Sequence, residues 1–244
     1  MAAQSKTPVR TEKGAIETTR SSGAEVDAFL TRVKSMRPTT VSGRGRLIFA
    51  MDATMSRQPT WDLALKLQGD MFQAVKDVGG LDVQLVYFRG FNETKASKWI
   101  GDPDAVARLM SRVACEGGYT QIQKVLSHAR GESAATRVNA LVYVGDAMEE
   151  NIDELAQRAG ELRLLGVPCF MFQEGYDKKA ERAFKEIAKL TRGAYCRFDS
   201  GSASQLGDLL KAVAVYATGG RKALKDFSQA TRSSAGSLLL EQLS

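Results

Sequence analysis

The fold is decided by Leu47-Ile48-Phe49-Ala50-Met51-Asp52-Ala53-Thr54-Met55-Ser56. The first half of this stretch is a continuous apolar run, which is typical of a strand buried on both faces of a parallel sheet. In the second half, alternation lets Asp52, Thr54 and Ser56 present their oxygens toward one point. Ligands of open α/β sheets bind at the carboxyl ends of the strands. The stretch therefore predicts a central strand with a candidate site at its end.

The rest of the chain alternates between strand-like and helix-like segments. This alternation predicts an α/β fold: a doubly wound, Rossmann-like, mainly parallel six-stranded sheet with helices on both faces. The turn at residues 89–92 is too short for a parallel crossover, so the third strand is expected to be an antiparallel edge strand. The other expected strands cover residues 81–88, 94–100, 138–144, 169–172 and 194–198. Amphipathic helices are expected from near Pro59 to Val78, over 104–115, and between the later strands, where apolar residues recur at helical spacing.

Composition shifts divide the chain into four parts. Polar, Ser/Thr-rich sequence at the start predicts disorder, and Gly219-Gly220 is expected to close the folded domain. An apolar patch, Leu238-Leu239-Leu240, lies beyond it. The expected parts are a disordered basic tail (1–23), a short helix and linker (24–43), the folded domain (44–218) and a C-terminal tail (219–244).

Charge and cysteine content limit the functional class. The 244 residues carry a formal net charge of +6, and residues 1–46 hold nine basic side chains against four acidic ones. Such an arm can attract nucleic acid, acidic proteins or anionic lipid. Three widely spaced cysteines argue against a disulfide framework. Without an apolar signal segment or an 18-residue apolar span, the sequence predicts a cytoplasmic protein that does not cross a membrane.

Two further loops place oxygen ligands at the same edge of the sheet. Thr120 follows Gly117-Gly118-Tyr119, and Asp146 closes the strand expected over 138–144. With the first loop, these give two carboxylates and three hydroxyls from three loops. A donor set made only of oxygen suits Mg²⁺ or Mn²⁺. Because Mg²⁺ takes six oxygens, one position would remain for a carboxylate from outside.

The combination of Asp-x-Thr-x-Ser, a Thr after Gly-Gly, and Gly-Asp at a strand end resembles the von Willebrand factor A family with its metal-ion-dependent adhesion site. The resemblance covers residues 44–218 and is to the intracellular bacterial type. It implies a non-catalytic adaptor in which the metal coordinates an Asp or Glu of a protein partner. It also implies that the metal ligands are Asp52, Thr54, Ser56, Thr120 and Asp146. Ala147 departs from the family, which commonly has Gly there.

Other interpretations of the same residues stay open. Asp52 and Ser56 could cap a helix, Thr120 could cap the next, and Asp146 could hold a turn. The basic arm could bind nucleic acid while the metal site is vestigial. A metal-dependent phosphoester hydrolase is a third alternative. A serine hydrolase is disfavoured, because the sequence has a single histidine, His128, and no G-x-S-x-G motif.

Overall fold

The computed structural model describes residues 28, 44–60, 80–198 and 203–230. Several predictions fall outside these residues. They are the basic tail over 1–23, almost all of the expected helix and linker over 24–43, the amphipathic helix expected in the segment 61–79, and the C-terminal tail from 231 onward with Leu238-Leu239-Leu240.

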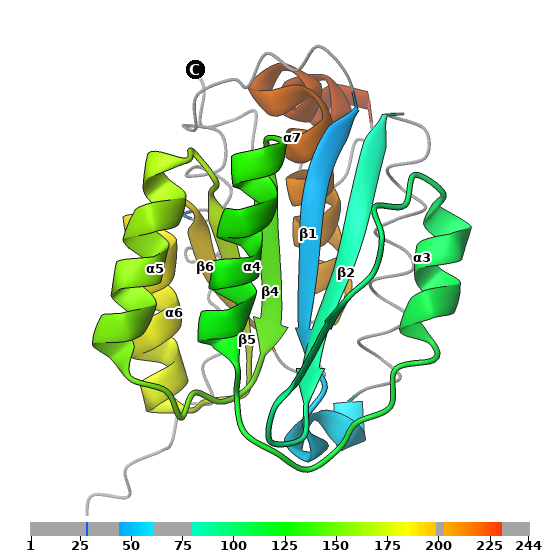
Figure 1. Ribbon diagram of the computed structural model, residues 1–244. Helices are drawn as coiled ribbons and strands as arrows, with labels where there is room; N and C mark the ends of the chain where they lie inside the picture. Colours follow the sequence, from blue (N-terminus) through cyan, green and yellow to red (C-terminus); the bar gives the residue numbers. More distant parts are fainter. Residues whose placement is uncertain (1–27, 29–43, 61–79, 199–202, 231–244) are drawn as a thin grey trace, which may run out of the picture.

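The described chain forms a six-stranded sheet in the order β3-β2-β1-β4-β5-β6 (Figure 1). β2 and β3 pair antiparallel, and every other neighbouring pair is parallel. This confirms the expected fold class and the antiparallel edge strand. The strands are β1 (Gly45–Asp52), β2 (Leu81–Arg89), β3 (Glu93–Ala96), β4 (Ala140–Gly145), β5 (Cys169–Glu174) and β6 (Ala194–Phe198).

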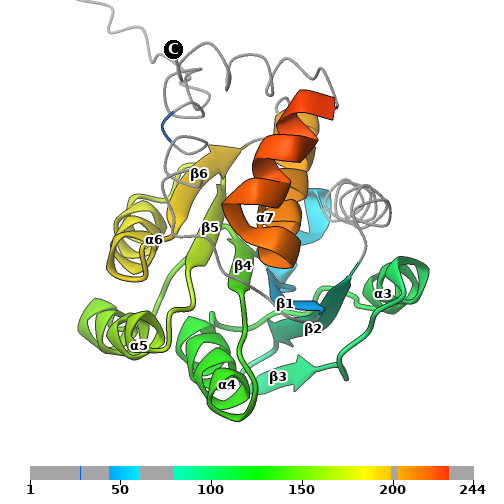
Figure 2. The same ribbon diagram turned by 90° about the horizontal axis from the view of Figure 1, so that it is seen from above.

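Helices cover both faces of the sheet. Figure 2 shows α4, α5 and α6 on one face and α3 and α7 on the other. A short 3-10 helix, η1 (Met55–Thr60), follows β1 at the carboxyl edge. None of the described helices is both long and apolar enough to cross a membrane. The helix bounds are α3 (Pro103–Met110), α4 (Ile122–Ala135), α5 (Ile152–Leu164), α6 (Lys178–Leu190) and α7 (Ala203–Ala230).

The central strands are buried on both faces because both helical layers pack on them. In β1, Leu47, Phe49 and Met51 join the core under α3 and α7. Ile48 and Ala50 point the other way, into the core under α4, α5 and α6. A strand covered on both sides has no need for polar alternation, which explains the uninterrupted apolar run that the sequence shows.

Two expected element bounds are wrong, and the reasons are local. β3 ends at Ala96 rather than near residue 100, because the Ser97 hydroxyl accepts a hydrogen bond from the Leu85 N–H (3.0 Å). The chain then rejoins β2 only through a bridge between Ile100 and Val83. α3 ends at Met110 rather than near residue 115, because the following segment turns back toward the first loop.

The last helix is longer than the sequence suggests. α7 continues through Gly219-Gly220 to Ala230, so the predicted boundary at residue 218 falls inside this helix. Ala223 and Phe227 lie beyond the two glycines and pack against the core. Their burial offsets the roughly 1 kcal/mol per residue that glycine costs inside a helix. Tertiary packing therefore overrides the local stop signal.

Candidate functional site

The first loop gathers its three oxygen-bearing side chains as the sequence predicts. Asp52 ends β1, and its Oδ1 accepts a hydrogen bond from the Thr54 N–H (2.8 Å). The hydroxyls of Thr54 and Ser56 lie 3.0 Å apart. Asp52 and Thr54 are buried, whereas Ser56 is exposed. The loop therefore has an inner carboxylate and an outer hydroxyl that reaches the surface.

Asp52 is a buried carboxyl group with one oxygen left over. Its Oδ2 has no hydrogen-bond partner within the part of the chain that the structure describes. Burial, with a smaller contribution from the Asp146 carboxylate, raises the pKa of Asp52 to about 6 against the opposing effect of the Thr54 hydrogen bonds. A buried carboxylate oxygen without a hydrogen bond destabilises the folded state, and a bound cation would remove that penalty.

The raised pKa of Asp52 predicts how stability depends on pH when metal is withheld. The folded-state pKa is about 6 and the ordinary value is 3.8. Between those values the folded state binds more protons than the unfolded state, so stability falls as pH rises. With EDTA present, the unfolding free energy is expected to drop by up to about 3 kcal/mol between pH 4 and pH 7 from this group.

The measurement is urea unfolding of the wild type and of Asp52→Asn across that pH range. Asparagine retains the oxygen that accepts from Thr54 but does not ionise, so the difference between the two curves isolates Asp52. A difference that does not change with pH would contradict the prediction.

The third loop brings the second carboxylate to the same edge. β4 lies beside β1, with Val144 opposite Met51. Asp52 and Asp146 therefore lie at the carboxyl ends of two adjacent strands. Asp146 Oδ1 is also buried, and no described residue offers it a hydrogen bond. Two carboxylates thus each keep one unsatisfied oxygen at adjoining strand ends.

The second loop is joined to the third by hydrogen bonds that sequence reasoning missed. The Thr120 hydroxyl accepts from the Glu149 N–H (3.1 Å), and Glu149 Oε2 accepts from the Thr120 N–H (3.0 Å). Glu150 accepts from the N–H groups of Ile122 (2.6 Å) and Gln123 (2.9 Å). Thr120 therefore does not cap α4. Glu150 does, from 28 residues away.

This cap explains how α4 begins at a residue that sequence rules do not favour. Its N-cap residue, Gln121, makes no side-chain hydrogen bond to the helix. The first N–H groups of a helix need acceptors and attract negative charge. The only signal in the sequence was the acidic pair Glu149-Glu150. No local rule links an acidic pair to the start of a helix that lies earlier in the chain.

Close backbone approach fixes the second loop against the β2–β3 turn. A Cβ on Gly118 would overlap the carbonyl oxygen of Gly90, whereas Gly117 has open space around it. The Tyr119 N–H donates to the same Gly90 oxygen (3.2 Å), and the Glu116 N–H donates to Ala53 O (3.0 Å). The loop that carries Thr120 is therefore held on both the first loop and the turn.

This close approach distinguishes two adjacent glycines. Gly118→Ala is expected to lower the unfolding free energy by about 1–3 kcal/mol, because the methyl group forces the loop away from the turn. Gly117→Ala, the matched control, is expected to change it by less than about 0.5 kcal/mol. Urea unfolding of both variants checks this, and equal effects would show that the two loops do not touch.

Two further buried groups border the site and were not predicted. Arg57 follows the first loop in η1 and forms an ion pair with Glu174 at the end of β5 (Nε–Oε2 2.8 Å). Its positive charge lowers the pKa of Asp52, which opposes the larger effect of burial. Tyr143, in β4, places its hydroxyl beside Gly145. Neither could be found from the sequence, since both depend on packing between distant segments.

The oxygen atoms at this edge suit a single small, hard cation. The described residues contain no group of three or more His, Cys, Asp or Glu side chains placed to hold a metal ion. The oxygens that are brought together come instead from two carboxylates and the Thr54 and Ser56 hydroxyls. Unsatisfied carboxylate oxygens and hydroxyls are ligands that Mg²⁺ accepts, with water completing the six positions.

The fold is similar to that of several solved structures. No protein-family model matches the sequence, and no curated protein matches it. A von Willebrand factor type A structure from Catenulispora acidiphila is similar (TM-score 0.58, 14% identity), over 70% of this chain and 42% of that one. The SpRpn10 VWA domain is similar over 68% of this chain and 94% of that one (TM-score 0.55, 14% identity). The chain has the von Willebrand factor A fold.

A third solved structure is also similar in fold. The pilus adhesin SpaC from Lactobacillus rhamnosus GG matches over 79% of this chain and 32% of its own (TM-score 0.55, 11% identity). At these identities the likeness concerns the fold alone. Within the von Willebrand factor A fold of this chain, the three loops described above lie together at the carboxyl edge of the sheet.

Proposed function

We propose that this von Willebrand factor A fold is a non-catalytic, metal-dependent protein-binding domain, an adaptor of the intracellular type. Mg²⁺, or Mn²⁺ in its place, would be held at an adhesion-type site and would coordinate an Asp or Glu side chain of a partner. The observation that carries the proposal is the pair of buried carboxylate oxygens without partners, Asp52 Oδ2 and Asp146 Oδ1. The residues proposed to hold the metal are Asp52, Thr54, Ser56, Thr120 and Asp146.

The proposed ligands do not contribute equally. Asp52 and Asp146 neutralise the cation, and the Thr54 and Ser56 hydroxyls complete one side of it. Thr120 also accepts from the Glu149 N–H, so it would act with one remaining lone pair or through water. Such a set leaves coordination positions for water and for one carboxylate from outside. The metal's role would be to dock an acidic side chain.

The surroundings of the site support binding over catalysis. Hydrolysis of an ester or phosphoester needs a general base, and histidine is the commonest. The one histidine of the sequence, His128, lies in α4 with its Nε2 2.8 Å from Gln84 Oε1 in the middle of β2. It is therefore engaged with the body of the sheet. A cytoplasmic location is part of the proposal, and the Cys169 thiol, which is buried in the core and forms no disulfide, supports it.

The proposal is tested by capture of partners from native lysate under three conditions. Wild type in millimolar Mg²⁺, wild type in EDTA, and Asp52→Ala in Mg²⁺ are compared, with Glu154→Ala, an exposed acid on α5, as the matched control. Circular dichroism verifies that each variant is folded, and calorimetry measures metal binding directly.

The expected result is a protein retained only by wild type and Glu154→Ala in Mg²⁺. If the same proteins or nucleic acids are retained in every lane, recognition does not use the metal, and the basic N-terminal arm becomes the candidate. Turnover of a phosphoester in Mg²⁺ that Asp52→Ala abolishes would replace the adaptor with a hydrolase.

A further inference from the structure

Large apolar side chains are exposed around the candidate metal site. Four of the six exposed ones among the described residues lie at the carboxyl edge of the sheet, one at the start of η1 and three in loops. Phe91 in the β2–β3 turn is 75% exposed and Tyr119 before α4 is 58% exposed. We call the four the apolar rim: Met55, Phe91, Tyr119 and Tyr176. Exposed apolar groups gathered at one place mark interaction surfaces.

The two most exposed members of the rim form a pair. The rings of Phe91 and Tyr119 lie edge to face, with centroids 5.5 Å apart. The loops that carry them touch where Gly118 meets the Gly90 carbonyl. Aromatic pairs of this kind present a large contact area with few rotatable bonds, which suits them to anchor a bound segment.

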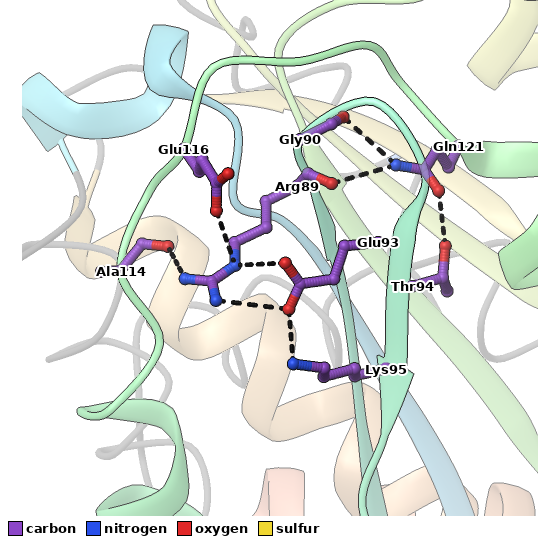
Figure 3. A network of polar contacts seen from close by, with 8 residues as sticks. All are labelled: Arg89, Gly90, Glu93, Thr94, Lys95, Ala114, Glu116 and Gln121. Atoms are coloured by element: carbon purple, nitrogen blue, oxygen red, sulfur yellow. Dashed lines mark hydrogen bonds and ion pairs between the residues drawn. The ribbon is translucent and has the colours of Figure 1, made fainter.

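A polar network holds the Phe91 turn rigid from two sides (Figure 3). The Arg89 guanidinium donates to both Glu93 carboxylate oxygens (3.0 and 3.2 Å) and to the Ala114 carbonyl (3.0 Å). The Gln121 amide donates to the carbonyls of Arg89 (3.2 Å) and Gly90 (3.4 Å). A turn pinned in this way loses little entropy on binding, so the rim is pre-organised.

The rim and the site together define the chemistry of a ligand. This step rests on the proposed function, since the metal supplies the central charge. Met55 and Tyr119 belong to the loops that carry Thr54 and Thr120, and Tyr176 follows the neighbouring strand β5. A segment that fills such a surface needs one carboxylate for the metal and large apolar side chains immediately beside it.

The chain itself contains a segment with that chemistry. Residues 238–241 read Leu-Leu-Leu-Glu, the one place in the sequence where three leucines precede an acid. We propose that residues 238–241 of one copy dock on the rim of a second copy. Glu241 would coordinate the metal, and the three leucines would cover the Phe91–Tyr119 pair.

The length of chain after Ala230 favours docking on a second copy over docking on the chain's own site. Residue 217 lies against Gly45, at the amino end of β1, and α7 then continues to Ala230 on that side. Asp52 is seven strand residues from Gly45, about 23 Å along β1. Glu241 is eleven residues past Ala230 and reaches at most about 40 Å when fully extended. The thirteen residues of α7 from Ala217 to Ala230 add about 20 Å of helix to the roughly 23 Å along β1, so a path back along both elements is longer than that reach.

Docking between copies would be head to tail. α7, which precedes the donor segment, ends on the side of the amino end of β1, and the acceptor site lies at the carboxyl edge, so the two surfaces differ. Such heterologous contacts produce rings or open chains rather than a symmetric dimer. Self-association that needs metal is the observable consequence.

The test uses a fluorescent peptide of residues 233–244 and the full-length chain carrying Glu241→Gln, so that the receptor's own segment does not compete. Anisotropy titrations are run in Mg²⁺ and in EDTA, and calorimetry measures Mg²⁺ binding separately. Receptor variants add Phe91→Ser or Tyr119→Ser, with Leu164→Ser as the matched control, because Leu164 is 88% exposed at the end of α5, away from the rim. Sedimentation velocity compares wild type with Glu241→Gln.

The expected result is peptide binding in Mg²⁺ that weakens at least about 10-fold with Phe91→Ser or Tyr119→Ser, while Mg²⁺ affinity and Leu164→Ser binding stay unchanged. Wild type then self-associates in Mg²⁺ and Glu241→Gln does not. Mg²⁺ binding without peptide binding overturns this inference and leaves the proposed function standing, whereas absence of Mg²⁺ binding overturns the proposed function itself. A monomeric wild type that blocks the peptide overturns docking between copies, because its own segment then fills its own site.

Discussion

The Asp52→Asn variant is expected to bind Mg²⁺ at least about 100-fold more weakly than the wild type at pH 7. Even residues that only support a metal ligand change affinity by about 10–100-fold when replaced, and Asp52 is proposed as a direct ligand with half of the site's negative charge. Isothermal titration calorimetry with Mg²⁺ and with Mn²⁺ measures the loss. Asparagine keeps the size of the side chain and the acceptor for the Thr54 N–H, so the loop is expected to stay in place.

The same substitution has an opposite effect on the metal-free domain. Removing a buried charge next to Asp146 relieves both desolvation and repulsion, so Asp52→Asn in EDTA is expected to be more stable than the wild type at pH 7. Loss of metal affinity together with a gain in unfolding free energy is expected of a residue that serves function and destabilises the fold. A variant that loses stability and retains Mg²⁺ affinity would show that Asp52 is a structural cap. Glu154→Gln serves as the control, with neither quantity expected to change.

The second large effect is expected from Arg57. Its side chain is 1% exposed, and that of its ion-pair partner Glu174 is 12% exposed. Arg57→Met leaves the Glu174 carboxylate buried without its cation, which is expected to lower the unfolding free energy by about 3–5 kcal/mol. Urea unfolding in EDTA measures this.

Two comparisons make the Arg57 result specific. Breaking the exposed pair between Arg108 and Asp102 with Arg108→Met is expected to cost less than about 1 kcal/mol. The double variant Arg57→Met with Glu174→Leu is expected to recover the part of the loss that comes from the orphaned Glu174 carboxylate, whereas the smaller part that comes from Asp52, which also loses the nearby positive charge, remains. If the double variant is as unstable as Arg57→Met alone, the loss comes from packing around Arg57 and not from the orphaned carboxylate.

The candidate site divides into a part that local sequence predicts and a part that it does not. Asp52, Thr54 and Ser56 lie within five residues of each other at the end of a recognisable strand, so their meeting follows from the strand's alternation. Asp146 could be added because parallel strands end at a common edge. The hydrogen bonds between Thr120 and Glu149 were not predicted, because they join segments 29 residues apart.

The sequence by itself determined the fold class, the six strands and the antiparallel edge. Each of these follows from short-range patterns of burial, and a buried strand must be apolar whatever its neighbours are. Only the tertiary structure decided where α7 ends, that Glu150 caps α4, and that the positive charge of Arg57 lies near Asp52. Those outcomes depend on the energy of packing one segment against another distant in sequence. Local propensities of about 1 kcal/mol or less per residue are too small to fix them.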